Sequence, residues 1–450
     1  MSCNDKRDFR GHSTQSGGYE FHVGTAPLGI VTKTSSPLEF TTVAAFDTAT
    51  GEYFETEWNS KKQTSEISPP AKDYRANRWA LKSASNKILP GSRTSKCMVF
   101  RAPDGLGGIC KTVDIVKSSS LKKASYKNLM ACGSVWNCPV CAAKISERRR
   151  IELKSALNVA RSKNWGIHFV TLTVPHGIGD DLSNILSCMQ GAVKRLSSGK
   201  YSIKSALKKI DPQNEIYGFI RAKEVTHGKK NGFHPHIHMI VFTDSNLKSS
   251  ALNTIYKKSW SNACRLAGLP VPSDAHGCTV KDGSFASEYI SKWGIEDEMT
   301  KANSKVSKNK GVTPFGLLRC YLDGDEEYSQ EEAKNLFLVY SHAFKGQRQL
   351  YWSNGLRALL DLSAELSDEE LATKEEDQDS ILLAQLTFEE WKAVRYFKQE
   401  AQVLNVAEIS QESLKFFILN LLDSYLKIRA PQRGKGPCGK GDPVRSAGIN

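Results

Sequence analysis

Hydrophobic and polar residues show two different patterns along the middle of the chain. Three short stretches rich in β-branched, aromatic and other apolar residues have the character of strands: residues 167–174, 217–226 and 235–242. Other stretches place apolar residues three and four apart, which is typical of amphipathic helices: residues 180–197, 249–267 and 284–293. Together these elements predict an α+β fold with an antiparallel sheet.

Three histidines alternate at the start of the third strand: His234, His236 and His238. Side chains two residues apart share one face of a strand. Imidazoles side by side before a strongly apolar stretch are costly to bury unless they are partnered. Either they hydrogen-bond within the core, or His236 and His238 bind a metal ion while His234 stays outside the pair.

The preceding strand supplies a third ligand if the two strands form a hairpin. Residues 228–232 are a glycine-bounded loop of suitable length. Pairing of His227 with Phe233 places Glu224 directly opposite His236, whereas a slip of one residue turns Glu224 to the other face. A carboxylate and two imidazoles with open positions suit Mn²⁺ or Mg²⁺ acting on a phosphate.

A candidate nucleophile follows in the helix-like stretch 284–293. Phe285, Tyr289 and Lys292 lie along one face at spacings of three and four. A tyrosine hydroxyl is a poor nucleophile at its ordinary pKa of about 10. Attack therefore requires a metal that polarises the target phosphate and a nearby cation, for which Lys292 is the candidate.

A second candidate metal site lies upstream, where Cys132, Cys138 and Cys141 fall within ten residues. The chain has eleven cysteines, an odd number, and no evident signal peptide, so we expect a reducing cytoplasmic location. Clustered cysteines then indicate metal ligands rather than disulfides, or else small buried apolar residues. A closed zinc site needs a fourth ligand, and the spacing leaves both Cys97 and Cys110 open.

The net charge of +14 understates the basic character of the chain. Residues 361–379 hold nine acids and one lysine, so the remainder carries +22. This imbalance favours salt-sensitive binding to polyanions. Arg148, Arg149 and Arg150 open a predicted long helix and are candidates for DNA-backbone contact, although such a run also suits a solvated face. No apolar run reaches the roughly 20 residues of a membrane span.

Three motifs of this chain resemble those of HUH endonucleases. Their order along the chain is similar to that of the rolling-circle replication initiator (Rep) proteins of small bacterial plasmids. Residues 169–175 resemble the first Rep motif, 234–238 the second and 289–292 the third. Residues 132–141 and 346–356 are also similar to segments of this group. The similarity covers roughly residues 90–360.

The resemblance implies a ferredoxin-like or RRM-like antiparallel core, with the histidine strand central and the tyrosine helix packed on the sheet. It implies that Tyr289 nicks single-stranded plasmid origin DNA, forms a 5′-phosphotyrosine and leaves a 3′-OH primer. A host helicase and DNA polymerase are then the expected partners. The resemblance favours Cys97 as the fourth zinc ligand, so the expected cofactors are Mn²⁺ or Mg²⁺ and a structural Zn²⁺.

One position departs from the family pattern. Some relatives carry a glutamate four residues before the tyrosine, where this chain has Phe285. Glu288 is the neighbouring acid, but on a helix it points about 100° away from Tyr289, so termination is left open between Glu288, another acid and a second tyrosine. Three other functions compete: a conjugative relaxase with the same chemistry, a histidine-triad nucleotide hydrolase, and a non-catalytic zinc-containing DNA-binding protein.

The sequence divides into five expected segments. They are a largely disordered N-terminal segment (1–75), a zinc and basic-helix region (76–165), an HUH endonuclease domain (166–360), an acidic linker with a helical C-terminal region (361–430) and a flexible tail (431–450). Within the fourth segment, Thr387 and Glu390 form a capping-box pattern that predicts the start of a helix.

Overall fold

The computed structural model describes residues 42–46, 53–57, 71–119, 122–200, 202–291, 311–373 and 380–429. The chain divides into two units, residues 1–68 and 69–450. In the first unit, β1 (Thr42–Phe46) and β2 (Tyr53–Glu57) pair as an antiparallel hairpin. Apart from this hairpin and residues 71–75, the segment expected to be disordered (1–75) lies outside the described residues, as does the expected tail (431–450).

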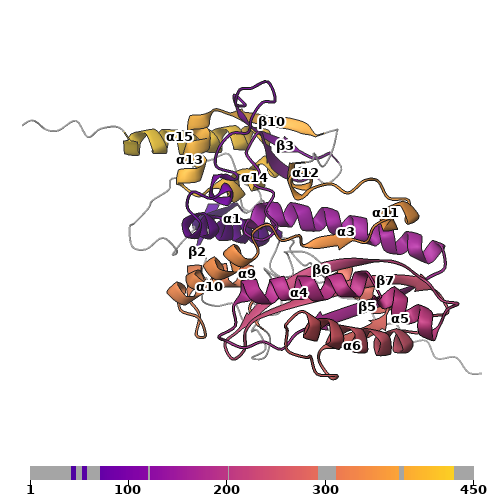
Figure 1. The fold of residues 1–450 in the computed structure, drawn as a ribbon. Helices are drawn as coiled ribbons and strands as arrows, with labels where there is room; N and C mark the ends of the chain where they lie inside the picture. The colour runs from indigo at the N-terminus through magenta and orange to yellow at the C-terminus, as the bar shows by residue number, and fades with distance from the viewer. Residues whose placement is uncertain are drawn as a thin grey trace, which may run out of the picture. The chain divides into compact units, whose positions relative to one another are not determined.

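A five-stranded antiparallel sheet forms the centre of one part of the second unit (Figure 1). Its strand order is β8-β5-β7-β6-β9, so β7 is central. The strands are β5 (Trp165–Thr173), β6 (Ile216–Gly228), β7 (Gly232–Asp244), β8 (Cys278–Asp282) and β9 (Leu350–Trp352). The three predicted strands correspond to β5, β6 and β7, which confirms the antiparallel α+β arrangement.

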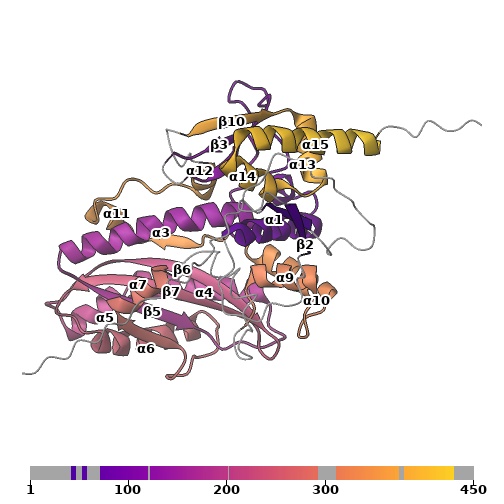
Figure 2. The ribbon, with the colours of Figure 1, turned by 180° about the vertical axis from the view of Figure 1, so that it is seen from behind.

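Helices cover both faces of this sheet because successive side chains of its strands point to opposite sides. On one side, which we call the α6 face, apolar side chains of β5 and β7 pack against α4 (Leu182–Ser197), α5 (Ile203–Ile210) and α6 (Ser249–Leu266). On the other, the α3 face, they pack with α3 (Pro139–Ser162), α7 (Gly283–Ser291) and α11 (Leu356–Leu359). Figures 1 and 2 show α3 on one side of the sheet and α6 on the other.

A further core joins the cysteine-rich region to the C-terminal part of the chain. Buried residues between positions 81 and 145 share it with residues between 315 and 425. It contains an antiparallel sheet of order β10-β3-β4, formed by β3 (Val113–Lys117), β4 (Ala124–Lys127) and β10 (Ile381–Leu386). Its helices are α1 (Ala71–Ile88), α2 (Arg93–Lys96), α9 (Pro314–Asp323), α10 (Gln330–Ala343), α12 (Asp368–Thr373), α13 (Phe388–Tyr396), α14 (Glu400–Ile409) and α15 (Gln411–Arg429).

The predicted capping box at Thr387 is confirmed. The Thr387 hydroxyl accepts a hydrogen bond from the Glu390 amide, and the Glu390 carboxylate accepts one from the Thr387 amide at 2.7 Å. This reciprocal bonding satisfies free amides at the start of α13. Across the described residues, no helix combines the length and apolarity needed to span a membrane.

Candidate active site and cysteine cluster

The β6–β7 hairpin has the register that places a carboxylate opposite the histidines. His227 pairs with Phe233, and Glu224 pairs with His236. On the other side of β7, Thr171 of β5 pairs with His238. Glu224, His236 and His238 therefore lie together on the α3 face, and we refer to these three residues as the histidine site.

The ligand atoms of the histidine site converge on one carboxylate. His236 Nε2 lies 3.3 Å and His238 Nε2 3.5 Å from Oε2 of Glu224. The hydroxyl of Tyr289, which α7 carries over the sheet, donates a hydrogen bond to Oε1 of Glu224. The side chains are 14% exposed for His236, 16% for His238 and 39% for Glu224, so the site is partly open to solvent.

Contacts of the Nδ1 atoms of His236 and His238 fix the orientation of the two imidazole rings. His236 Nδ1 lies 3.1 Å from the carbonyl oxygen of His234, which can only accept, so Nδ1 carries the proton. His238 Nδ1 lies 3.1 Å from the hydroxyl of Thr171. Both Nε2 atoms are thus directed toward Glu224. Two imidazole nitrogens and a carboxylate with an open side fit a catalytic divalent cation such as Mn²⁺.

Electrostatics within the histidine site favour a charged carboxylate. Burial acts to raise the pKa of Glu224, but hydrogen bonds and positive charge from His236 and His238 outweigh it and hold the pKa far below its ordinary value. Burial alone would lower the pKa of His236, yet its contact with Glu224 raises it. Burial and the charge of Glu224 raise the pKa of Tyr289 well above its ordinary value, so its hydroxyl is protonated at neutral pH.

His234 lies beside the histidine site without joining its ligand set. Its ring stacks on that of His236 at a centroid distance of 5.1 Å, and its Nδ1 lies 3.3 Å from Nδ1 of His176. Burial and the neighbouring His236 lower the pKa of His234 to about 4, so this ring is neutral.

Two residues that support the site were not predicted from the sequence. Thr171 contacts His238 as described above, and the ring of Phe169 contacts the rings of both His238, at a centroid distance of 5.1 Å, and Tyr289, at 4.9 Å. Phe169 is buried, so it limits where the tyrosine ring can lie. Both residues belong to the stretch 169–175, and their spacing of two places them on one face of β5, but the sequence does not show what that face meets.

The remaining residues predicted around the tyrosine are less well placed or lie outside the described chain. Phe285 is 38% exposed, and Lys281 Nζ lies 4.2 Å from its ring centroid. Glu288 is exposed on α7. Lys292 lies outside the described residues, so its role stays a prediction.

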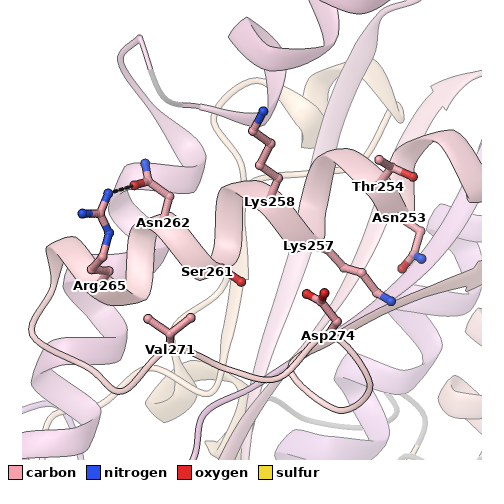
Figure 3. A pocket seen from close by; sticks show the side chains of 9 residues that line it. All are labelled: Asn253, Thr254, Lys257, Lys258, Ser261, Asn262, Arg265, Val271 and Asp274. Carbon is pink, nitrogen blue, oxygen red and sulfur yellow. Dashed lines mark hydrogen bonds between the residues drawn. The ribbon is translucent and has the colours of Figure 1, made fainter.

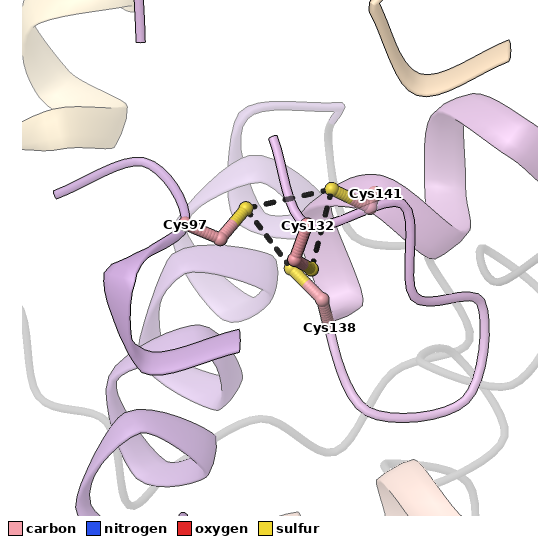
Figure 4. A group of neighbouring side chains, drawn as sticks. All are labelled: Cys97, Cys132, Cys138 and Cys141. Atoms are coloured by element: carbon pink, nitrogen blue, oxygen red, sulfur yellow. Dashed lines mark hydrogen bonds between the residues drawn. The ribbon is translucent and has the colours of Figure 1, made fainter. Parts of the chain in front are cut away.

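Four buried cysteines come together upstream of the sheet (Figure 4). The cysteine cluster consists of Cys97, Cys132, Cys138 and Cys141, whose sulfur atoms all lie within 4.8 Å of one another. Cys97 Sγ is 3.7 Å from Cys138 Sγ and 3.5 Å from Cys141 Sγ. Cys110 lies apart, with its sulfur 3.6 Å from the carbonyl oxygen of Pro103. The structure thus brings Cys97, not Cys110, to the other three.

The geometry of the cysteine cluster fits a tetrahedral zinc ion. Zinc–sulfur bonds of about 2.3 Å place neighbouring sulfurs about 3.8 Å apart, close to the observed spacing. Cys138 is the N-cap of α3 and Cys141 lies in its first turn, where the helix dipole favours a thiolate. Hydrogen bonds from Cys132, Cys138 and Cys97 lower the pKa of Cys141 well below its ordinary value.

The three arginines that follow the cluster have partners within the protein. Arg149 is 4% exposed and forms an ion pair with Asp368 of α12. Arg148 donates to the carbonyl oxygen of Leu371, and Arg150 binds Glu147 of its own helix. Because α12 covers Arg149, its guanidinium does not face solvent. DNA contact by these arginines stays a prediction, and Arg149 is the least accessible of the three.

A polar hollow of about 630 Å³ lies elsewhere, on the outer side of α6 (Figure 3). Its lining includes the cations Lys257, Lys258 and Arg265, with Arg265 donating a 2.8 Å hydrogen bond to Asn262. Because α6 packs on the opposite side of the sheet from the histidine site, this hollow is a separate feature.

Comparisons with known proteins relate this chain to replication proteins. A family model described as replication protein (Rep_1) matches residues 125–400. The chain is 28% identical over 309 residues to a protein of Streptomyces lividans named Protein rep, covering 55% of this chain and 67% of that protein. It is 25% identical over 140 residues to Protein rep of Lentilactobacillus hilgardii (30% and 41%).

A third relative, named Neomycin resistance protein, comes from Streptomyces cyanogenus and is 31% identical over 132 residues, or 25% of this chain and 30% of that protein. The chain thus spans about two thirds of the first relative and less than half of the other two. No solved structure matches the chain.

Proposed function

Since this chain belongs to the replication protein family, we propose that it initiates plasmid rolling-circle replication by nicking one strand of the origin DNA. The observation that carries the proposal is the meeting of Glu224, His236, His238 and Tyr289 on the α3 face. These residues come from three separate elements, β6, β7 and α7. A tyrosine hydroxyl against a carboxylate–histidine site is an arrangement suited to phosphoryl transfer.

In the proposed step, Oη of Tyr289 attacks the scissile phosphorus. A bond forms between Oη and phosphorus, and the bond from phosphorus to the 3′ oxygen breaks. The tyrosine hydroxyl is oriented by its hydrogen bond to the charged Glu224 carboxylate, its proton passes to solvent, and the 3′ oxygen takes up a proton. The products are a 5′-phosphotyrosine and a free 3′-OH, from which a host polymerase would extend after a host helicase separates the strands.

The histidine site would hold Mn²⁺ or Mg²⁺, which supplies Lewis-acid polarisation of a phosphate oxygen. The chain's own residues set the geometry: Thr171 and the His234 carbonyl orient the two imidazoles, and Phe169 confines the Tyr289 ring. Joining needs no ATP, because the phosphotyrosine bond conserves the energy of the broken phosphodiester. Lys292 remains the proposed cation, and Glu288 remains one candidate for termination, beside another acid or a second tyrosine.

We further propose that the cysteine cluster holds a structural Zn²⁺. Four thiolates leave no open position for a substrate, and the cluster ties α2 and α3 to the loop between β4 and α3. The core that surrounds it includes the C-terminal helices. Zinc would therefore act on the fold of this region, and through it on DNA binding, rather than on phosphoryl transfer.

The decisive experiment is a covalent-adduct assay. The protein is incubated with Mn²⁺ and labelled single-stranded origin DNA, and a band that resists denaturant is sought on a gel. Tyr289→Phe should abolish this band while DNA binding is retained. A band that persists in Tyr289→Phe would remove Tyr289 from its role, and no band on either origin strand would favour a non-catalytic DNA-binding protein.

A further inference from the structure

Strand β6 presents a cluster of basic and aromatic side chains on the face opposite the histidine site. A bulge between Ile216 and Gly218 resets the alternation, after which Phe219, Arg221 and Lys223 point away from Glu224 toward the α6 face. Tyr351 of β9 is the direct cross-strand partner of Arg221. We call Phe219, Arg221, Lys223 and Tyr351 the β6–β9 surface, and all four side chains are half-buried.

Cations and aromatic rings are in direct contact on the β6–β9 surface. The Arg221 guanidinium carbon lies 4.6 Å from the centroid of the Tyr351 ring. The rings of Phe219 and Tyr351 are 6.2 Å apart, with an interplanar angle of 35°. Alternating basic and aromatic side chains at the edge of a sheet form the kind of platform on which nucleic-acid bases stack while the backbone meets positive charge.

The positive charge of the β6–β9 surface is not neutralised within the described parts of the chain. Nε of Arg221 is buried and has no hydrogen-bond partner there. Lys223 donates to the neutral Gln347 side chain, and the charged groups that act on Arg221 and Lys223 include Arg348 and Arg221 itself but no carboxylate. A half-buried guanidinium that contacts an aromatic ring but no carboxylate is costly to desolvate, and a bound phosphate would offset that cost.

We propose that the β6–β9 surface binds the single-stranded part of the DNA substrate, with a phosphate held by Arg221 and Lys223 and a base stacked on Phe219 or Tyr351. The proposal rests on the DNA-nicking function above. Single-stranded DNA is favoured over a duplex because only an unpaired strand offers base faces to aromatic rings. Lys223 and Glu224 are adjacent in β6 and point to opposite faces, so this surface and the histidine site are separated by one sheet.

The β6–β9 surface lies at the edge of the sheet that is formed by the short strand β9. Strand β9 has three residues and is the last strand of the sheet. The segment that leads into β9 also fixes the surface, since Gln347 accepts a hydrogen bond from Lys223 and its carbonyl accepts one from Trp136 at 2.7 Å. Trp136 belongs to the loop of the cysteine cluster, which links that cluster to the DNA-facing residues of β6.

The test measures affinity of the full-length protein for fluorescein-labelled oligothymidine and for a duplex of equal length, across a series of salt concentrations. Arg221→Gln should weaken oligothymidine binding about tenfold and reduce the dependence of affinity on salt by about 0.7 in slope, as expected for one lost phosphate contact on a single strand. Phe219→Leu should weaken it about tenfold without a change in slope, because it removes stacking alone.

Arg265→Gln, in the hollow on α6, is the matched control and should leave oligothymidine affinity within about twofold, an energy difference below about 0.5 kcal/mol. Unchanged affinity in both Arg221→Gln and Phe219→Leu would overturn the proposal. An equal loss of duplex affinity would also overturn it, because the surface would then bind a backbone of either form.

Two further measurements keep the interpretation unambiguous. If Arg221→Gln lowers the melting temperature, Arg221→Lys decides: retained salt dependence supports the phosphate contact, and a loss equal to that of Gln rejects it. At saturating origin DNA, Arg221→Gln and Phe219→Leu should both still form the covalent adduct. If the wild-type protein forms no adduct but oligothymidine binding still depends on Arg221 and Phe219, the nicking proposal fails and the surface proposal stands.

Discussion

The cysteine cluster and the histidine site bring similar numbers of potential metal ligands together, but the protein closes them to different degrees. The four cysteines are at most 5% exposed and are packed within the core shared with the C-terminal helices. The ligands of the histidine site reach 39% exposure at Glu224, and one side is approached by Tyr289. A closed set of four thiolates excludes substrate, whereas a three-ligand set with an open side admits it.

The two sites also differ in what holds their ligands in place. Cys97 lies at the end of α2, Cys132 in the loop before α3, and Cys138 and Cys141 at the start of α3, so these ligands lie in a loop and at helix ends. The ligands of the histidine site lie on β6 and β7, which pair without a register shift from Gly218 to Gly228. Loss of metal should therefore damage the fold at the cysteine cluster and only the chemistry at the histidine site.

The largest effect is expected from Cys138→Ser. Zinc binding contributes about 10–16 kcal/mol in zinc-finger peptides, which is comparable to the whole stability of an ordinary domain, roughly 5–15 kcal/mol. The variant should lose zinc and the cooperative thermal unfolding of its α-helical signal, as measured by elemental analysis and circular dichroism. Cys110→Ser, outside the cluster, should behave as the wild type. A folded Cys138→Ser protein without zinc would show that the cluster is an ordinary buried core.

His236→Ala should show the opposite pattern. Loss of one imidazole from the histidine site should reduce adduct formation on the order of 10³-fold or more, because several kcal/mol of transition-state stabilisation depend on the bound cation. The melting temperature should change by only a few degrees, since the β6–β7 ladder remains. His234→Ala is the matched control and should keep most activity. Global unfolding of His236→Ala would contradict this distinction between the sites.

Site residues could be predicted from the sequence where nearby residues set their positions, and not where the positions depend on distant segments. The register of β6 and β7 is set by a short glycine-bounded loop, so the position of Glu224 opposite His236 could be predicted and is confirmed. Thr171 could not, because β5 and β7 are joined by a long connection and no turn fixes their register. The resemblance to plasmid Rep proteins is confirmed by the family match.

The roles of residues that depend on packing between distant segments could not be predicted from the sequence. Spacing could not choose between Cys97 and Cys110; the placement of Cys97 at the end of α2 decides it. Arg149 read as one of three exposed cations, but α12, more than 200 positions later, covers it and supplies Asp368. From the sequence, the charge of segment 361–379 predicts only an acidic linker.

Mild acid should separate the two sites without any mutation. Imidazole must be neutral to bind a cation, and contact with Glu224 raises the pKa of His236 above its ordinary value. Lowering the pH from about 7.5 to about 5.5 should therefore weaken Mn²⁺ binding at least tenfold, as measured by the electron paramagnetic resonance signal of free Mn²⁺, while zinc is retained.

This loss of manganese should not reflect unfolding. A raised folded-state pKa at His236 contributes stability to the metal-free protein at low pH, and that contribution disappears as the pH rises through the pKa. Glu224→Gln should shift the pH dependence of any remaining Mn²⁺ binding to lower pH. An affinity for Mn²⁺ that stays constant between the two pH values would exclude His236 as a ligand.

The smallest effect is expected from Thr171→Val, which keeps the shape of the side chain and removes the oxygen 3.1 Å from His238 Nδ1. Groups that orient a metal-bound histidine typically contribute about 10–100-fold to affinity or activity. Here stacking on Phe169 also holds the His238 ring, so we expect a loss of up to about tenfold in Mn²⁺ affinity with little change in melting temperature. Thr171→Ser restores the oxygen and should recover most of the affinity. If Val and Ser lose affinity equally, packing rather than the hydroxyl orients His238, and the histidine site would depend on its core in the way the cysteine cluster does.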